Sequence, residues 1–538
     1  MLRVLLCTLS TTLLFLTAFA QDDAQIPGFG VAHHDVGGNG STAPWPWQIY
    51  KSSPFNPPVM EIKTNGGSLA PGYIVTTQAN FRSNVTGAKE AAPLIMTDKG
   101  ELVWNGPIVN STNLRVQNYK GEPVLTYWSG LSTAGGNVGH GYGNVTVLDT
   151  SYNVIGTVCP DLQVTIPGNE TFDCKLDLHE SFMTDRDTIL VSAYNATPYD
   201  LTSVGGPKDG WTFDSLFFEI DPISNEILFR WSSQEHVPIT HTHQPRNGVG
   251  ANSSFPYDWF HINAVVNIGD HYLINARHTW ETYLVDSKGN LVWTINGETG
   301  GDFGPLPDDA HFRWQHFARP HNVTNSSIAI SWFNNNNQAV DNGTNPSNGL
   351  ELVLPLPASN VSSRRLQTTV RLDDPEQHIF ADSQGSYERD LYGTGNGFIA
   401  YGQISVLKEF GPDPTGNDVR WTARLGADNS VQLYRGYKQI WHATPTTKPS
   451  LVIEKNHNAS AGGIAAYGYV SWNGATDVTG WTVYAGESSA RRDLKKIGTV
   501  GYRGFETRFN VGSGSSCIRV AAVVNCTEGA QSEVICLG

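Results

Sequence analysis

A short strand–turn–strand unit recurs along the chain and constrains its fold more than any other feature of the sequence. Each copy has an aspartate just before a turn and β-branched or aromatic residues after it, as in MTDKGELVWNG (96–106), VLDTSYNVIGT (147–157), EIDPISNEILFRWS (219–232) and LVDSKGNLVWTING (284–297). Short apolar segments between the copies predict further strands, and helical periodicity is nearly absent. Repeats at an irregular spacing of roughly 50 to 75 residues are typical of a β-propeller with loop insertions. We therefore predict an all-β fold whose main part is a six-bladed β-propeller.

A second, smaller β-domain is predicted at the C-terminal end. The stretch HATPTTKPS (442–450) is rich in Pro and Thr and indicates a linker. The segments after it alternate between apolar and polar residues, and SWNGATDVTGWTVYAG (471–486) resembles fibronectin type III-like modules. We predict the propeller over residues 21–447 and a fibronectin III-like β-sandwich with a structural or docking role over 448–538.

The first twenty residues have the features of a secretory signal peptide. MLRVLLCTLSTTLLFLTAFA (1–20) has one basic residue, Arg3, then an apolar run and a small-residue cleavage site that ends at Ala20. No later stretch approaches the ~20 consecutive apolar residues of a membrane helix, and the C-terminus lacks the hydrophobic tail that directs a lipid anchor. We expect a secreted, extracellular protein without a membrane anchor.

Glycosylation sequons are unusually dense along the chain. One N-x-S/T sequence means little, but this density suits a glycosylated surface in a eukaryotic secretory pathway. The predicted glycosylation sites are Asn84, Asn110, Asn144, Asn169, Asn195, Asn252, Asn322, Asn342, Asn360 and Asn458.

The cysteines also fit an oxidising compartment. Cys159 and Cys174 lie close together in the sequence, and we predict a disulfide between them. Cys517, Cys526 and Cys536 are odd in number, so their pairing stays open. The chain has no C-x-x-C motif, and we expect no metal bound by thiolates.

Charge and motifs exclude several classes of function. The formal charge of −15 leaves no basic stripe to neutralise phosphates, so we expect no nucleic-acid partner. Several catalytic signatures are absent, namely G-x-S-x-G, H-E-x-x-H, a Walker loop and a dinucleotide-binding glycine motif. Histidines in or beside the strands are the remaining candidates: His140, His179, His236, His241, His243, His261, His278, His311, His316 and His321.

One hairpin allows three histidines to be sorted by position. The segment YDWFHINAVVNIGDHYLINARHTW (257–280) reads as two strands joined by a turn at NIGD (267–270). His261 and His278 lie about equally far from this turn, so antiparallel pairing brings them to the same end of the hairpin. His271 lies beside the turn, at the opposite end.

The polar residues at the first end predict a common pocket. Asn263 and Arg277 neighbour the two histidines and could face the same side. The alternative is that a strand histidine is a hydrogen-bonded filler, and we give His271 and His321 this interpretation. His241 and His243 could bind a metal, but no third ligand is apparent and a flexible loop is favoured. The aspartates before the turns are explained by side-chain capping.

Ten segments taken together resemble the arylsulfotransferase family, in its eukaryotic, largely fungal and secreted branch. They run in order from about residue 90 to 445: VLTYWSG, GHGYGNVTVLDTSY, DLHESFMTDRDTILVSAYN, FFEIDPISNEILFRWSSQEHV, DWFHINAV, YLINARH, LVDSKGNLVWTING, FRWQHFARPHN, SQGSYERDLYGTGNGFIAYGQ and YRGYKQIWHATP. The resemblance implies a six-bladed propeller with its site at the centre of the channel. It also implies sulfuryl transfer between phenols through a sulfohistidine, without a phosphoadenosyl donor or another cofactor.

The resemblance carries over to particular residues. The family's Q-H motif matches Gln315 and His316, which makes His316 the candidate nucleophile. The DW-x-H-x-N motif matches Asp258, Trp259, His261 and Asn263, and the R-H motif matches Arg277 and His278. We expect catalytic roles for His316, His261, His278 and Arg277, and substrate contacts from Asn263, Trp259, Gln315 and His179.

This assignment suits the chemistry of the side chains. A neutral imidazole can attack sulfur and act as a labile carrier. Preorganised donors stabilise the sulfuryl oxygens and the leaving phenolate, and a second histidine can carry the proton.

One element of the family's pattern is missing. Characterised bacterial members have an arginine between the R-H and Q-H motifs, whereas the interval after His278 has none until Arg313. Arg277, Arg313 or Arg319 would take its place. The expected partner is a small phenolic or sulfated aromatic compound, with no metal involved. Two alternatives remain, a non-catalytic propeller that binds a glycan or small aromatic ligand, and a metal- or quinone-dependent oxidoreductase.

Overall fold

The computed structural model describes most of the chain after residue 44. The described residues are 45–79, 87–133, 139–169, 171–338, 345–358, 366–428, 430–457, 464–490, 493–513 and 515–537. The predicted signal peptide (1–20) and the sequons at Asn84, Asn342, Asn360 and Asn458 lie outside the described residues. The chain divides into two compact units, and the smaller one combines Trp47–Pro57 with His442–Gly538.

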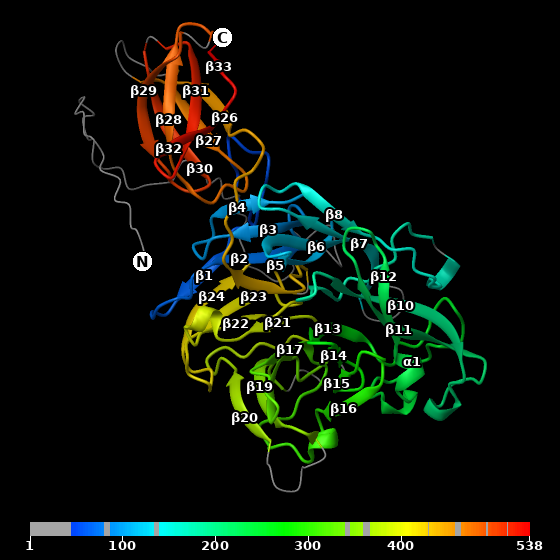
Figure 1. The fold of residues 1–538 in the computed structure, drawn as a ribbon. Coiled ribbons are helices and arrows are strands. Elements are labelled where there is room, and N and C mark those ends of the chain that lie inside the picture. The colour runs from blue at the N-terminus through cyan, green and yellow to red at the C-terminus, as the bar shows by residue number, and fades with distance from the viewer. Residues whose placement is uncertain are drawn as a thin grey trace. The chain divides into compact units, whose positions relative to one another are not determined.

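In the described part of the chain, the larger unit contains six antiparallel sheets that follow one another along the sequence (Figure 1). The first sheet has the strand order β25 (Gly436–Gln439), β2 (Tyr73–Gln78), β3 (Ala92–Met96) and β4 (Leu102–Asn105). The second sheet consists of β5 (Ser111–Tyr119), β6 (Glu122–Thr133), β7 (His140–Leu148) and β8 (Val154–Val158). The third sheet consists of β9 (Ser181–Met183), β10 (Ile189–Tyr199), β11 (Gly210–Ile220) and β12 (Ile227–Ser232). The next two are β13 (Ile262–Ile268), β14 (His271–Ala276), β15 (Glu281–Val285) and β16 (Leu291–Asn296), then β17 (His316–His321), β18 (Ser327–Asn334), β19 (Asn348–Pro355) and β20 (Gln367–Leu372). The sixth is β21 (Ser386–Glu388), β22 (Gly397–Ala400), β23 (Val406–Phe410), β24 (Val419–Arg424) and β1 (Glu61–Thr64).

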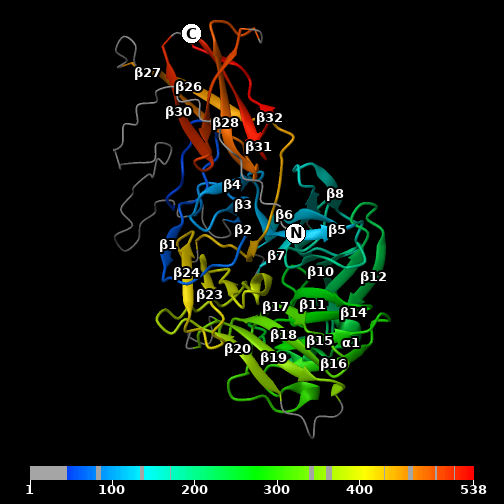
Figure 2. The ribbon, with the colours of Figure 1, turned by 60° about the vertical axis from the view of Figure 1, so that its left-hand side comes forward.

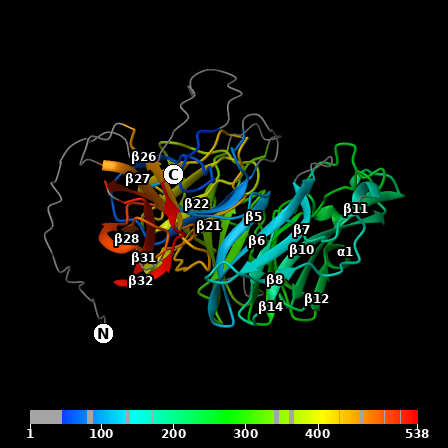
Figure 3. The same ribbon diagram turned by 90° about the horizontal axis from the view of Figure 1, so that it is seen from above.

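Helices are short in the described residues. They are α1 (Ser233–His236) and the 3-10 turns η1 (Pro167–Asn169), η2 (Thr202–Val204), η3 (Ile239–His241), η4 (Gly301–Phe303) and η7 (Leu391–Gly393). The prediction of an all-β protein is therefore confirmed, and consecutive four-stranded meanders are the arrangement typical of a propeller. Figure 3 shows β5, β6, β7 and β10 following one another across the larger unit.

Strands that are distant in the sequence complete the first and last sheets. β25 pairs antiparallel with β2, so that Tyr73 lies opposite Gln439. β1 pairs antiparallel with β24. The Thr76 hydroxyl adds a 2.9 Å hydrogen bond to the carbonyl of Arg435, 359 residues away. A strand from the C-terminal part of the larger unit therefore completes its first sheet, and a strand from the N-terminal part completes its last sheet.

Burial explains the sequence pattern of the strands. The middle strands β10 and β18 are almost continuously buried, which fits their apolar runs because both of their faces are covered. The outer strands β8 and β16 are largely exposed at their first residues. Outer strands are therefore more exposed than middle strands, although the exposed first residues of β8 and β16 are apolar.

The recurrent aspartates cap the turns, as the sequence predicts. Asp149 Oδ1 accepts hydrogen bonds from the backbone N–H groups of Ser151 and Asn153, at 2.8 and 2.9 Å. Asp221 and Asp286 make equivalent bonds in their own turns. The first copy differs, because Thr97 Oγ1 rather than Asp98 accepts from the turn. Asx and Ser/Thr turns of this kind fix the register of each hairpin.

The smaller unit has two sheets that share one hydrophobic core (Figure 2). One sheet is β26 (Ser450–Lys455), β27 (Ile464–Ser471) and β30 (Glu506–Gly512). The other is β29 (Lys495–Gly501), β28 (Val478–Gly486), β31 (Cys517–Val524) and β32 (Thr527–Gln531), with β33 (Ile535–Cys536) pairing with β31. The core contains Trp481 and Phe509, one from each sheet. The segment Trp47–Pro57 is held here by Ser52, whose backbone N–H donates to Glu506 at 2.6 Å.

Two disulfides join described cysteines. Cys159 and Cys174 are bonded to each other, which confirms the predicted pair. Cys517 and Cys536 form the second disulfide and tie β33 to the start of β31. Among the residues that the structure describes, no helix has the length and apolar character needed to cross a membrane.

Candidate functional site

Left-handed residues interrupt the first strands of two neighbouring sheets. His261, just before β13, has φ 58°, and Phe317 in β17 has φ 57°. The strand register shifts at both places. A bulge of this kind re-aims the neighbouring side chains, and left-handed non-glycine residues cluster at functional sites. The residues of the DW-x-H-x-N and Q-H motifs flank these two bulges.

The hairpin brings His261 and His278 into one buried cluster around Asp258. His261 Nδ1 lies 2.5 Å from Asp258 Oδ2, and His278 Nδ1–H donates to the carbonyl of Asp258 at 2.7 Å. The two imidazole rings are 4.7 Å apart. His271, at the turn, is half-exposed and pairs with the exposed Asp270 at 2.6 Å. The hairpin thus separates the histidines by position as its strand directions require.

His316 is held in one tautomer. Its Nδ1–H donates to Asn335 Oδ1 at 2.7 Å. The Asn335 amide is fixed because its Nδ2 donates to the carbonyls of Ala381 and Gln384, at 2.9 and 3.1 Å. The backbone N–H of Gln384 points at the other ring nitrogen, His316 Nε2, from 3.2 Å. Nε2 therefore carries a lone pair.

Arg277 interacts with both His278 and His316. Its Nη1 donates to His278 Nε2 at 2.8 Å, and its Nη2 donates to the carbonyl of Asp382 at 2.6 Å. Burial lowers the pKa of His316 well below its usual value, and the Arg277 charge lowers it further. His316 is consequently neutral at physiological pH, and its Nε2 electron pair faces the Gln384 N–H.

The other two arginines that could replace the missing family arginine lie elsewhere. Arg319 pairs with Glu180 at 2.9 Å. Arg313 is placed over the ring of Trp280, 5.9 Å from its centroid. Among these three arginines, Arg277 is the one that donates to a histidine of the cluster.

Burial and charge set the protonation of the other histidines. Burial lowers the pKa of His261 to about 3 despite its carboxylate partner, and lowers that of His278 well below the usual value. Burial alone would raise the pKa of Asp258, but His261, His140 and His278 outweigh it and hold this pKa well below the usual value. His261 and His278 are therefore neutral beside an ionised carboxylate, whereas the burial of His140 is outweighed by Asp258 and Asp177, which raise its pKa.

Three predicted substrate contacts lie in the packing around this cluster. Asn263 Nδ2 donates to the carbonyl of Gln315 at 2.9 Å, and Asn275 Nδ2 donates to Asn263 Oδ1 at 2.7 Å. Gln315 Nε2 donates back to Asn275 Oδ1 at 3.0 Å. Trp259 is fully buried in a hydrophobic core with Tyr283. These hydrogen bonds join β13, β14 and β17 and hold His316 beside the hairpin.

His179 and His140 enlarge the cluster on its other side. The His179 ring lies 4.7 Å from that of His261, and the His140 ring lies 5.3 Å from it. Asp177 contacts His179 Nδ1. Neither His140 nor Asp177 had a predicted role, although both lie in the segments GHGYGNVTVLDTSY and DLHES, which resemble the family. Asn335 lies in an asparagine-rich loop, and Gln384 lies in the segment SQGSYERDLYGTGNGFIAYGQ, which resembles the family but in which no residue was assigned a role.

A buried ionic cluster supports this side. Glu180, next to His179, pairs with Arg319 and with Arg435, the latter at 2.8 Å. Burial alone would raise the pKa of Glu180, but Arg319, Arg435 and Arg115 outweigh it and hold this pKa at about 2. The hydroxyl of Tyr434, beside Arg435, donates to the carbonyl of His179 at 3.2 Å.

His321 lies outside the cluster and gives a test of how buried histidines affect stability. Burial and the charges of Arg389 and Arg319 lower its pKa to about 3, and its Nε2 contacts Ser331 Oγ at 2.8 Å. Between pH 6.5 and 3 the unfolded chain binds a proton that the folded chain does not, so the stability contribution is lost as pH falls. We expect His321→Asn to remove about 2 kcal/mol of the loss in unfolding free energy between pH 6.5 and 5, as measured by urea denaturation. An unchanged pH dependence in the variant would contradict this expectation.

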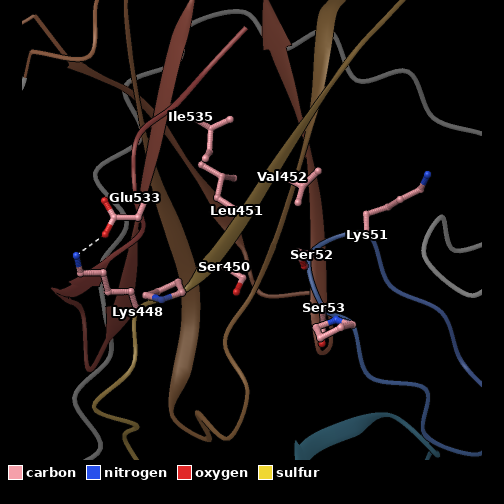
Figure 4. Close-up of a pocket in the computed structure, with 11 residues that line it drawn as sticks. Lys51, Ser52, Ser53, Lys448, Ser450, Leu451, Val452, Glu533 and Ile535 are labelled. Carbon is pink, nitrogen blue, oxygen red and sulfur yellow. Dashed lines mark hydrogen bonds and ion pairs between the residues drawn. The ribbon is translucent and has the colours of Figure 1, made fainter. Parts of the chain in front are cut away.

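The smaller unit has a groove of a different kind (Figure 4). Its lining includes Leu451, Val452 and Ile535, together with the exposed ion pair of Lys448 and Glu533. Exposed ion pairs of this type contribute little energy. Histidines line the buried cluster of the larger unit and not this groove, so the chemistry of the candidate site belongs to the larger unit.

Solved structures resemble this chain only distantly. The periplasmic gluconolactonase of Pseudomonas aeruginosa is 12% identical over 77% of this chain and 97% of its own, with a TM-score of 0.24. A GH43 protein from Bacillus licheniformis is 7% identical over 79% of this chain and 90% of its own, with a TM-score of 0.28. The polysaccharide lyase Uly1 is 10% identical over 86% of this chain and 90% of its own, with a TM-score of 0.29. Similarities this low carry no argument about function.

The family comparison is more specific. No curated protein matches the chain. A family model described as arylsulfotransferase (ASST) matches residues 115–426, which span the motifs at His261, Arg277 and His316. Since this match covers more than half of the chain, the protein belongs to the arylsulfotransferase (ASST) family.

Proposed function

We propose that the protein transfers a sulfuryl group from a phenol sulfate to a second phenol, through a sulfohistidine on His316 and without a phosphoadenosyl donor. Membership of the family implies arylsulfotransferase-like function and phenolic substrates. The observation that carries the finer proposal is the tautomer of His316. Its Nδ1–H is bound to Asn335, which directs the lone pair of Nε2 away from that amide. A nucleophile of this kind must be neutral and oriented.

In the first step, His316 Nε2 attacks sulfur as the bond from sulfur to the donor's phenolic oxygen breaks. The 3.2 Å contact from the Gln384 N–H marks the direction of the lone pair and must open for attack. Arg277 lies beside the ring and supplies a fixed positive charge for the sulfuryl oxygens and the departing phenolate. In the second step, the acceptor's phenolic oxygen attacks sulfur and the bond from nitrogen to sulfur breaks.

His261 is our candidate for the proton carrier. Its Nδ1 is bound to Asp258, so that its Nε2 can take the acceptor's proton and later return it to a departing phenolate. The carboxylate of Asp258 orients this ring and stabilises the imidazolium that forms. His278 contacts Arg277 through Nε2 and the Asp258 carbonyl through Nδ1, and it orients both neighbours.

The larger architecture belongs to the same proposal. We propose that the six sheets are the blades of a closed propeller over residues 21–447 and that residues 448–538 form a fibronectin III-like sandwich. An N-terminal signal over 1–20 would direct the protein to the extracellular space, as in the fungal branch of the family. The exposed Asn252 and Asn322 support glycosylation of this surface.

An assay with a chromogenic donor tests the proposed function. We expect the purified protein to release nitrophenol from 4-nitrophenyl sulfate when phenol is added, at about pH 6 to 9, with parallel double-reciprocal lines that indicate a covalent intermediate. Phenyl sulfate should form in equal amount, without any phosphoadenosyl compound. Absence of nitrophenol with every phenolic acceptor tried would contradict transfer and favour the alternative, a non-catalytic propeller that binds a glycan or aromatic ligand.

A further inference from the structure

His140 is a buried residue at the start of β7 whose two ring nitrogens face different carboxylates. Its Nε2 lies 3.1 Å from Asp258 Oδ2, and its Nδ1 lies 3.8 Å from Asp177 Oδ2. Only 3% of the residue is exposed. Among the described residues, its Nδ1 has no hydrogen-bond partner. One side of the ring is therefore satisfied and the other is not.

The unsatisfied side presents two electron-rich atoms to each other. When Nε2–H donates to Asp258, the neutral ring keeps a lone pair on Nδ1, directed toward an anionic oxygen of Asp177. A distance of 3.8 Å is too long for a hydrogen bond. A ring nitrogen and an anionic oxygen that face each other in a buried site need a positive charge between them. Burial alone would lower the pKa of His140, but Asp258 and Asp177 outweigh it and raise this pKa, so a proton and a metal ion compete for this position. His179 adds a third ligand, since the nitrogens of both histidines and an Asp177 oxygen lie within 4.8 Å of one another.

The surroundings hold Asp177 in a fixed orientation. The backbone N–H of Gly141 donates to Oδ2 at 3.0 Å. The backbone N–H of His179 and the hydroxyl of Ser192 donate to Oδ1, at 3.0 and 3.3 Å. On the far side of the ring, the bond from His140 Nε2 to Asp258 matches the carboxylate–histidine–metal arrangement that orients metal ligands in proteins.

We propose that His140, Asp177 and His179 bind a divalent first-row transition-metal ion, through His140 Nδ1 and an Asp177 oxygen. Two imidazoles and one carboxylate are a ligand set used for zinc and iron, and they leave a coordination position open. Ligand bonds of about 2.0–2.2 Å in a tetrahedral site put ligand atoms roughly 3.4 Å apart, so the Asp177 oxygen and His140 Nδ1 need to approach by only about 0.4 Å. His179 is then a metal ligand and not a substrate contact.

The sequence predicts no bound metal, and the proposed metal site does not depend on the proposed function. Metal content is measured without a substrate. The experiment can therefore contradict the metal site while sulfuryl transfer is confirmed, or confirm the metal site while sulfuryl transfer is contradicted. Asp258 Oδ2 contacts both His140 and His261. One carboxylate therefore connects a ligand of the proposed ion with the proposed proton carrier.

Metal titration of the full-length protein tests the proposal, with zinc as the probe. After treatment with a chelator, we expect one zinc ion per chain by calorimetry and elemental analysis, together with a rise in the melting temperature. His140→Phe should weaken zinc binding by at least about 100-fold, because it removes a ligand. The phenyl ring preserves the packing of the His140 ring on Tyr194, whose centroid is 3.9 Å away. Asp177→Asn should have the same effect.

Two controls keep the result interpretable. His321→Phe removes a histidine outside the cluster, and His241→Ala removes one from an alternative metal pair; both should bind zinc like the parent protein. Circular dichroism of each variant establishes that it is folded. Cobalt bound in the proposed site gives visible absorption bands, which cobalt bound at the protein surface does not give. Unchanged zinc binding in folded His140→Phe, or loss of binding in His241→Ala, would overturn the proposal. So would a parent protein that binds no zinc.

Discussion

Replacement of His316 by alanine is expected to lower the rate of sulfuryl transfer by about 10⁴-fold or more, because it removes the nucleophile itself. His278 cannot replace it, because its Nε2 accepts a hydrogen bond from Arg277. His261 donates to Asp258 through Nδ1, and in the proposed mechanism its Nε2 carries the proton. Nitrophenol release from 4-nitrophenyl sulfate, measured with the parent protein alongside, gives the ratio.

A labelling experiment separates loss of the nucleophile from loss of folding. Incubation with ³⁵S-labelled donor and no acceptor should leave acid-labile label on the parent protein and none on His316→Ala. The matched control is His271→Ala, which removes a half-exposed histidine at the turn of the neighbouring hairpin and should leave the rate unchanged. Equal loss of activity in the two variants would mean that position in the hairpin does not distinguish the histidines.

Replacement of Glu180 by glutamine is expected to cost about 3–5 kcal/mol of unfolding free energy, because it leaves buried arginines without their counter-charge. Glu180 is almost fully buried and pairs with Arg319 of β17 and with Arg435, which lies just before β25. The amide keeps the shape of the side chain but not its charge. Urea denaturation at neutral pH should show the loss as a lower midpoint with the same slope.

The control for this variant is Glu226→Gln, which makes the same change on an exposed turn and should alter stability by less than about 0.5 kcal/mol. If Glu180→Gln accumulates only as insoluble protein, the soluble fraction of the two variants gives the comparison. A midpoint equal to that of the parent protein would show that water or another group compensates the arginines.

The repeated hairpins are what made the fold predictable. An aspartate before each turn and an apolar strand after it are local features, and Asp149, Asp221 and Asp286 cap their turns as expected. Hairpin geometry is also local, so the common end of His261 and His278 follows from their distance to one turn. The closing pairs, β25 with β2 and β1 with β24, join residues hundreds of positions apart and have no signature in a sequence read locally.

The sequence identified the site residues that belong to short motifs, but not the hydrogen-bond partners that come from distant segments. Gln315 and His316 are adjacent in the sequence, but the amide that sets the His316 tautomer is Asn335, in an asparagine-rich stretch interpreted as a loop. Asp258 appeared as part of a motif, whereas its contact with His140 spans 118 residues. Buried polar groups find partners wherever the fold brings them, and sequence spacing says nothing about such pairs.

The pairing of β25 with β2 has a consequence for synthesis on the ribosome. The edge of β2 emerges early, but its partner is translated more than 350 residues later, as the 359-residue bond from Thr76 to Arg435 shows. At ordinary translation rates this interval is on the order of tens of seconds. During that time an apolar strand edge stays open to other nascent chains. The first sheet is complete only when β25 emerges.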